Sequence, residues 1–298
     1  MWLRATDRIR GMYPILFRVA GFPIRSFGLM VALGFVVGTM IYGRLVTRHS
    51  DDPERDAERY AAIPVWVLFG VVIGARMLYV AVEIAKGSGV GRSYLDDPLT
   101  VLAIWKGGLV MYGGLFGAMA AGVWCAKRQQ VPLRHALDLG LAAGFFGLAI
   151  GRIGCLLVGD DYGSIVPEAY RGLPFPITLR VPQVLREHSL FGAENAGQVL
   201  WATQPWMTVN ATLIGLLGVW LLKRRRYPGQ VSLVLLLLYA VTRSVIEQFR
   251  GDDIRGKWFG DAISTSQLIG LIAGLVVVFL LFKNRGRRET LASAGPVR

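Results

Sequence analysis

The sequence predicts an all-α polytopic membrane protein. Hydrophobic residues make up 53% of its 298 residues and only 18% are charged, which is too apolar for a soluble protein of this length. The chain also contains long uncharged runs, close to the roughly 20 residues that a helix needs to cross a bilayer. We therefore expect a single membrane domain over residues 1–298 with about seven transmembrane helices.

Three of the predicted spans are uncharged runs of 18 to 21 residues, and four are shorter or interrupted by polar or charged residues. The uncharged runs are 26–43, 107–126 and 262–282. The other four spans are about 60–83, 136–158, 206–222 and 228–249.

The net charge of +13 is concentrated at the ends of these spans. The two densest basic clusters are residues 223–226 and 283–288, and such clusters are typical of cytoplasmic loops. Seven spans then place the N-terminus outside and the C-terminus in the cytoplasm. Because the charge marks topology in this way, we expect no nucleic-acid partner.

Two segments between spans are predicted to lie outside the membrane core. Residues 159–205 are polar, carry five prolines and hold no spanning run, which indicates a small extracytoplasmic cap between the fourth and fifth spans. Residues 84–106 end in an apolar stretch, 98–105, whose terminal Trp105 is typical of the membrane interface. We expect an interfacial helix there.

A stripe of glycines dominates the fourth span. Gly140, Gly144, Gly147, Gly151 and Gly154 are spaced by four, three, four and three residues and so share one helical face. Such a face lets a neighbouring helix approach to backbone distance. Beside this stripe lies Arg152, a charge that costs about 2.5–3.5 kcal/mol at membrane depth even on the lower scales.

Other charges lie at similar depth. Arg243 and Glu247 are four residues apart, so they share a face and can pair, and Arg250 continues that face. Arg76 and Arg152 then lack an acidic partner other than Asp138. Either they bind backbone carbonyls or snorkel to the surface, or they form a buried site for an anion such as a lipid phosphate.

The remaining chemistry-bearing residues indicate neither a disulfide nor a metal site. Cys125 and Cys155 fall on different spans, and the three histidines are scattered in loops. We expect no metal and no cofactor.

Six sequence blocks, in order and at compatible spacing, resemble the prolipoprotein diacylglyceryl transferases, enzymes of the bacterial inner membrane. The resemblance covers most of the chain, and each block alone is weak. The blocks are Ile24–Met30, Gly74–Tyr79, Gly107–Leu115, Gly151–Gly163, Arg243–Asp253 and Ser264–Leu268.

The resemblance implies a reaction as well as a fold. The family moves the sn-1,2-diacylglyceryl group of phosphatidylglycerol to the lipobox cysteine thiol in the signal peptide of a preprolipoprotein. A thioether forms and glycerol phosphate leaves. No enzyme nucleophile is needed, because the substrate brings its own sulfur.

Carried onto this sequence, the resemblance and the charge pattern identify the expected site residues. Arg152 is the first candidate for the phosphate, Arg243 oriented by Glu247 the second, and Arg76 a third. The other expected substrate-binding residues are Gly113, Gly114, Asp160, Gly163 and Arg250. We expect the glycines to bring backbone N–H groups toward a head group. Asp161 is interpreted as a solvated loop carboxylate.

Several positions depart from the family pattern. Phe27 stands where the family usually has Tyr, Tyr112 where many members have His, Cys155 where Asn is usual, and Asp160 where Glu is usual. A further departure lies ahead of the fifth span, where residues 204–210 keep only the proline of the family's stretch.

These departures leave the proton acceptor open. Tyr112 is expected to be a catalytic residue, either as a phenolate stabilised by arginines or by positioning lipid while Glu247 or Asp160 takes the proton.

Two other functions remain open on the sequence. A catalytically altered relative would bind anionic phospholipid or lipoprotein signal peptides without transfer, or would use another donor. An unrelated transporter would line an anion or proton path with the same charges, but the inverted repeats common in transporters are not evident.

Overall fold

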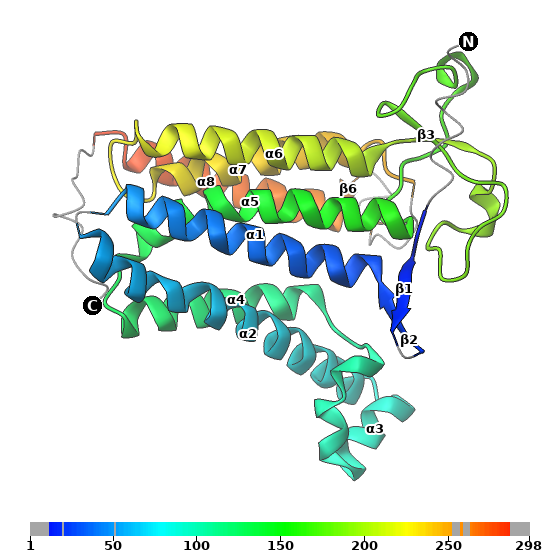
Figure 1. Cartoon of the computed structure of the whole chain (residues 1–298), viewed down its shortest axis with the longest axis horizontal. Coiled ribbons are helices and arrows are strands. Elements are labelled where there is room, and N and C mark those ends of the chain that lie inside the picture. The colour runs from blue at the N-terminus through cyan, green and yellow to red at the C-terminus, as the bar shows by residue number, and fades with distance from the viewer. Residues whose placement is uncertain (1–11, 20, 51, 252–256, 259–262, 287–298) are drawn as a thin grey trace. The chain divides into compact units, whose positions relative to one another are not determined.

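The computed structural model describes residues 12–19, 21–50, 52–251, 257–258 and 263–286 (Figure 1). They fold into α-helices with short antiparallel strand pairs between them. Two compact units divide at residues 45/46 and 136/137, so that residues 46–136 form the second unit and the described residues on either side form the first. The single membrane domain expected from the sequence stays a prediction.

The first unit contains most of the helices. Its helices are α1 (Ser26–Arg48), α5 (Leu133–Val158), α6 (Thr203–Leu222), α7 (Gln230–Glu247) and α8 (Thr265–Lys283), with a few terminal residues of α1 and α5 in the second unit. Its strand pairs are β1 (Ile15–Val19) with β2 (Phe22–Arg25), β3 (Thr178–Arg180) with β4 (Val199–Trp201), and β5 (Lys257–Trp258) with β6 (Ile263–Ser264).

The second unit consists of α2 (Pro53–Ala85), α3 (Gly89–Asp96), the 3-10 turns η2 (Pro98–Leu102) and η3 (Ile104–Lys106), and α4 (Met111–Arg128). Each of the seven predicted spans thus coincides with a helix. Of the helices in the described chain, six are long and apolar enough to cross a membrane. The exception among the seven is α4, whose 18 residues end in Lys127 and Arg128. The count of seven spans and their orientation stay predictions.

Helix α5 lies at the centre of the first unit because its small residues admit three neighbours. A Cβ added to Gly147 would lie 2.7 Å from the carbonyl oxygen of Gly34, so α1 meets α5 at backbone distance as the glycine stripe predicts. On another side Phe146 contacts Gly215 of α6. The ring of Phe145 lies 5.4 Å from that of Tyr239 on α7.

The stripe is only partly used for this packing. Gly154 also faces α1, where an added Cβ would lie 3.0 Å from the Met30 side chain. Gly144 and Gly151 have no atom within 4 Å of an added Cβ. The close approach of α1 therefore depends on particular glycines, and above all on Gly147.

Asp138 is a buried cap for a helix that follows much later in the chain. Its carboxylate accepts hydrogen bonds from the backbone N–H groups of Gly229 and Ser232, both at 2.8 Å, and pairs with Arg225 at 3.0 Å. The first-turn N–H groups of α7 lack partners within the helix, and Asp138 supplies one. Asp138 is therefore not the partner of Arg76 or Arg152 that the sequence left open.

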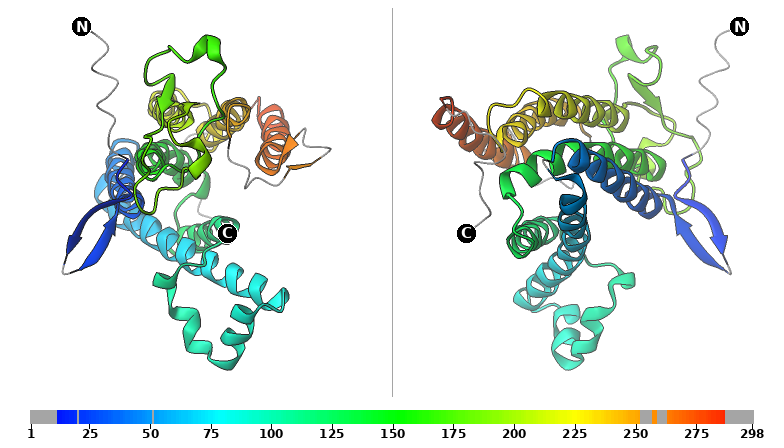
Figure 2. Two further views of the ribbon diagram at one scale, coloured as in Figure 1. Left: turned by 90° about the vertical axis from the view of Figure 1, so that its right-hand side faces the viewer. Right: turned by 60° about the vertical axis from the view of Figure 1, so that its left-hand side comes forward.

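In the second unit, α2 and α4 pack antiparallel through glycines, and both views in Figure 2 show the two helices side by side. Gly70 contacts Gly117, and Gly74 contacts Gly113, so closely that a Cβ on any of them would overlap backbone atoms of its partner. This contact replaces side-chain packing by direct backbone contact.

The segment after α2 differs from the predicted single interfacial helix. It forms α3 and then two short turns, η2 and η3, separated at Ala103. The predicted apolar surface is present, because Leu99 is 75% and Trp105 77% exposed. The broken helix has a cause in Arg76, which is described with the site.

The predicted cap lies between α5 and α6, over residues 159–202. Helix α6 begins at Thr203, earlier than expected, and Pro205 is accommodated in its first turn. A small apolar core holds the cap together, formed by Met12, Leu179, Val181, Phe191, Leu200 and Ala202. Strands β3 and β4 pair across this core.

We predict that Gly147→Leu destabilises the protein by about 1–3 kcal/mol, because the new side chain must push α1 away from α5. The free energy of unfolding would be measured by denaturing-detergent titration followed by tryptophan fluorescence. Gly144→Leu is the matched control on the same helix, since its Cβ points into open space. Equal stability of the two variants would contradict the packing role of Gly147.

Candidate active site

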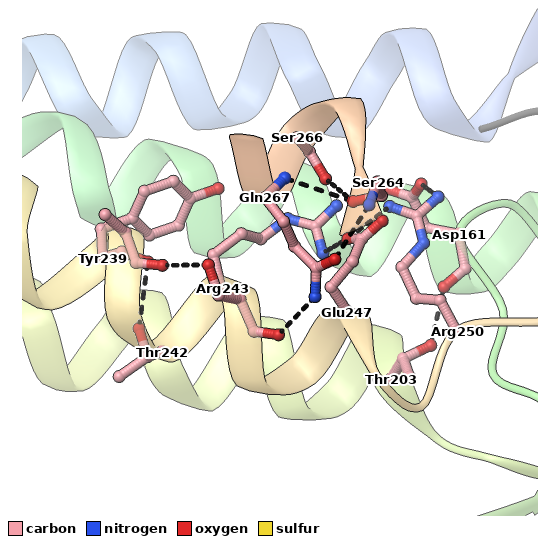
Figure 3. Close-up of polar contacts among 12 residues, drawn as sticks. Asp161, Thr203, Tyr239, Thr242, Arg243, Glu247, Arg250, Ser264, Ser266 and Gln267 are labelled. Carbon is pink, nitrogen blue, oxygen red and sulfur yellow. Dashed lines mark hydrogen bonds and ion pairs between the residues drawn. The ribbon is translucent and has the colours of Figure 1, made fainter. Parts of the chain in front are cut away.

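A cluster of buried and half-buried charges lies where α5, α7 and α8 end or begin (Figure 3). Arg152 on α5 pairs with Asp161 in the loop that follows the helix. Arg243 pairs with Glu247 one turn later on α7, as their spacing predicts. Arg250 follows α7 and joins the two pairs. All these residues belong to the first unit.

Asp161 is the bridge of the cluster. Its Oδ2 pairs with Arg152 Nη1, and its Oδ1 lies 2.5 Å from Arg250 Nη2. Each carboxylate oxygen therefore contacts a different guanidinium group, so Asp161 bridges two arginines with one charge-assisted contact to each. The prediction of a solvated loop carboxylate is wrong, because only 18% of the Asp161 side chain is exposed.

Glu247 is the second buried carboxylate. It is 4% exposed and pairs with Arg243, while Arg250 Nη1 lies 3.8 Å from its Oε2. The positive charges of Arg152 and Arg250 also act on Arg243. Three guanidinium groups thus share two carboxylates through ion pairs.

Polar groups of two helices border the charges. Tyr239 of α7 interacts with Arg152 through its hydroxyl. At the start of α8, Ser264 and Gln267 form a capping box, and Gln267 Nε2 donates to the Ser244 carbonyl oxygen at 3.3 Å. Figure 3 shows Ser264, Ser266 and Gln267 beside the Arg243–Glu247 pair.

Backbone contacts hold the Asp161 loop in place. Thr203 Oγ1 donates to the Asp161 carbonyl oxygen at 2.7 Å, and Gln204 Nε2 donates to that of Asp160 at 2.8 Å. Gly163 pairs with Arg250 in an isolated antiparallel bridge. A Cβ on Gly163 would overlap the Trp201 carbonyl oxygen, so only glycine lets the loop lie this close to β4.

Asp160 and Cys155 lie at the edge of this cluster. Asp160 Oδ1 accepts a hydrogen bond from the Asp161 N–H at 2.9 Å. The sulfur of Cys155 lies 3.9 Å from both Arg152 Nη1 and Asp161 Oδ2, and the thiol is free and buried. Cys125, in the second unit, is also free and buried.

Arg76, in the second unit, binds backbone carbonyl oxygens. Its guanidinium donates to the carbonyl oxygens of Val101 and Gly107 at 2.7 Å, and of Gly108 and Thr100 at 3.1 Å. Carbonyl groups that point toward Arg76 cannot accept the hydrogen bonds of a continuous helix. This explains why the helix is broken near Ala103. Of the two interpretations that the sequence left open, the carbonyl-binding one holds for Arg76.

Tyr112, Gly113 and Gly114 also belong to the second unit, in the first turn of α4. The two glycines do not form an open turn for a head group. Gly113 packs against Gly74 of α2, and the Gly114 N–H donates to the Val110 carbonyl oxygen at 3.2 Å. The close packing of α2 against both positions explains why neither residue carries a side chain. Tyr112 is half-buried.

Sequence reasoning missed the bridging role of Asp161 and the contributions of Tyr239 and Thr203. The signal for Asp161 was the charge balance, since three buried arginines with one paired glutamate require another anion. For Tyr239 the only signal was its position one turn before Arg243.

The arrangement is suited to binding an anion with several oxygens. Arginine forks from two helices and a loop converge, partly exposed, and their positions are fixed by carboxylates and backbone contacts. In a water-poor setting such donors stabilise developing negative charge without rearrangement.

Comparison with known proteins gives the family. A model described as prolipoprotein diacylglyceryl transferase matches residues 14–283. The phosphatidylglycerol–prolipoprotein diacylglyceryl transferase of Synechococcus elongatus is 27% identical over 266 residues, covering 87% of this chain and 83% of that protein. The enzyme of the same name from Aliivibrio salmonicida is 29% identical over 292 residues, covering 95% and 92%. The chain therefore belongs to the prolipoprotein diacylglyceryl transferase family, and it is a multi-pass membrane protein.

We predict that Gly163→Ala lowers the thermal stability of the purified protein, because the added Cβ forces the Asp161 loop away from Trp201 and Arg250. A loss of about 1–3 kcal/mol is expected for such overpacking. Differential scanning fluorimetry measures it. Gly172→Ala in the same cap is the control, since it meets no atom within 4 Å. Matching melting temperatures in the two variants would refute the close approach at Gly163.

Proposed function

We propose that this member of the family transfers the sn-1,2-diacylglyceryl group of phosphatidylglycerol to the lipobox cysteine of preprolipoproteins in the bacterial inner membrane. The observation that carries the proposal is the convergence of Arg152, Arg243 and Arg250 at the ends of apolar helices. These three guanidinium groups share only two carboxylates, which leaves an excess positive charge, and a lipid phosphate is an anion that a membrane supplies.

The reaction sets three requirements for the site. The thiolate of the substrate attacks the glyceryl carbon that bears the phosphate, a C–S bond forms, the C–O bond breaks, and glycerol phosphate leaves with the bonding electrons. The enzyme must stabilise the departing phosphate, accept the thiol proton and exclude water, which would otherwise compete as a nucleophile.

Arg152 and Arg243 are proposed to stabilise the departing phosphate. Arg152 projects from the glycine-rich α5, which packs at backbone distance against α1, and so its position is restrained. Glu247 orients Arg243 through their ion pair. Arg250 bridges to Asp161 and to Glu247 and completes the cationic surface. Stabilisation of developing charge by fixed donors usually lowers the barrier of such reactions more than any other single effect.

Other residues are proposed in supporting roles. Asp160 and Gly163 shape the loop that carries Asp161. Arg76 supports the exposed apolar segment over 98–105 through its bonds to backbone carbonyls. Tyr112 stands at the position where many relatives have His, and we assign it to the handling of the thiol proton.

We predict that Arg152→Ala and Arg243→Ala each lower transfer by about 10²–10³-fold, as removal of a preorganised donor usually does. Purified protein in phosphatidylglycerol micelles is incubated with a lipobox peptide, and the mass gain of the peptide is followed. Arg171→Ala on the cap surface is the control, and a peptide with Ser in place of Cys must gain no mass.

The same assay separates the proposal from its rival. Transfer that the control retains and both site variants lose would support the enzyme. Lipid binding without any transfer by the unmodified chain would instead favour a catalytically altered relative.

We predict that Tyr112→Phe lowers kcat by about 100-fold, the usual scale of a lost proton-transfer group, while KM for phosphatidylglycerol is unchanged. Initial rates at varied lipid concentration measure both constants. An unchanged kcat would exclude Tyr112 and direct attention to Glu247 and Asp160.

A further inference from the structure

Asp161 is a half-buried carboxylate for which the proposed reaction has no use. It contacts one nitrogen of each of two arginines, Nη1 of Arg152 through Oδ2 and Nη2 of Arg250 through Oδ1. One of these arginines is the first candidate for the lipid phosphate. The carboxylate therefore stands where a ligand oxygen would have to bind.

Carboxylates and phosphates present oxygens to guanidinium in the same fork geometry. An N–H group that donates to Asp161 cannot at the same time donate to a phosphate oxygen, so a phosphate that takes these two donors must displace the carboxylate. The backbone of Asp161 is held in the left-handed region at φ +53°, and Thr203 Oγ1 holds its carbonyl oxygen at 2.7 Å. The loop thus fixes the Asp161 backbone while only the side chain needs to move.

We propose that Asp161 is an internal substitute for phosphate, which pairs with Arg152 and Arg250 in the resting protein and is displaced when a phosphate ester binds. The identity of that ester, the diester of phosphatidylglycerol or the glycerol phosphate product, rests on the proposed function. Asp161 is then a specificity-determining residue and not a catalytic one.

The charge of Asp161 acts unequally on substrate and product. A phosphodiester carries one negative charge, whereas a phosphomonoester carries up to two, and Coulomb repulsion grows with the charge of the ligand. The Asp161 charge therefore weakens the binding of the product more than the binding of the substrate. Its role is to release glycerol phosphate after transfer, at the cost of some affinity for the lipid.

The test compares binding by full-length variants in detergent. Asp161→Asn removes the charge and keeps a residue that tolerates positive φ. Asp161→Gly does the same without a side chain, and it serves if the Asn variant fails to fold. Glu168→Gln is the control, because this cap carboxylate is 89% exposed and its loss changes the total charge equally. Calorimetric titration with sn-glycerol-1-phosphate, without peptide, gives Kd.

We expect Kd for sn-glycerol-1-phosphate to fall about tenfold in Asp161→Asn and in Asp161→Gly, the scale of one charged hydrogen bond. In nanodiscs of phosphatidylglycerol against phosphatidylcholine, the gain in affinity for the anionic lipid should be smaller, about threefold. Unchanged or weaker product binding in both variants would overturn the proposal, and so would an equal gain in Glu168→Gln.

The outcome is separable from that of the proposed function. Tighter product binding by the variants of a protein that shows no transfer would keep Asp161 as a phosphate substitute and reject the enzyme. Normal transfer by the unmodified chain, with weaker product binding by both variants, would keep the enzyme and make Asp161 a positioning residue.

Discussion

The structure of the first unit depends on one constraint, the neutralisation of guanidinium groups among apolar helices. Removing a cation from water costs several kcal/mol unless a partner compensates it. Here Asp161 and Glu247 provide that compensation, and each reaches more than one arginine. Ion pairs hold the ends of α5 and α7 together, whereas the rest of the two helices is held by side-chain packing.

Glycines restrain the backbones around these charges. A helix or loop that packs at backbone distance leaves the side chains it carries little freedom to move. Gly147 admits α1 beside α5, and Gly163 admits the loop beside β4 and Arg250. Arg76 shows the alternative solution, in which a buried guanidinium is satisfied by carbonyl oxygens and organises an irregular segment. Buried arginines in this chain are therefore satisfied either by carboxylates or by backbone carbonyl oxygens.

Local patterns predicted much of this. Uncharged runs located the helices, and a spacing of four residues paired Arg243 with Glu247. The bridge at Asp161 could not be predicted, because its partner Arg250 is distant in the chain and the bridge depends on a positive φ. The carbonyl cradle of Arg76 depends likewise on the conformation of residues 100–108. Contacts between residues distant in the chain could not be predicted from the sequence, whereas pairs of residues within one helical turn could.

The cap that Asp138 forms on α7 has a consequence for biogenesis. Its carboxylate is fully buried, yet its partners Arg225, Gly229 and Ser232 are synthesised only after the whole of α6. Until that loop has been made, the Asp138 carboxylate lacks the donors that compensate its burial, and an uncompensated buried carboxylate is costly. The burial of this end of α5 can therefore be completed only after the α6–α7 loop has been synthesised.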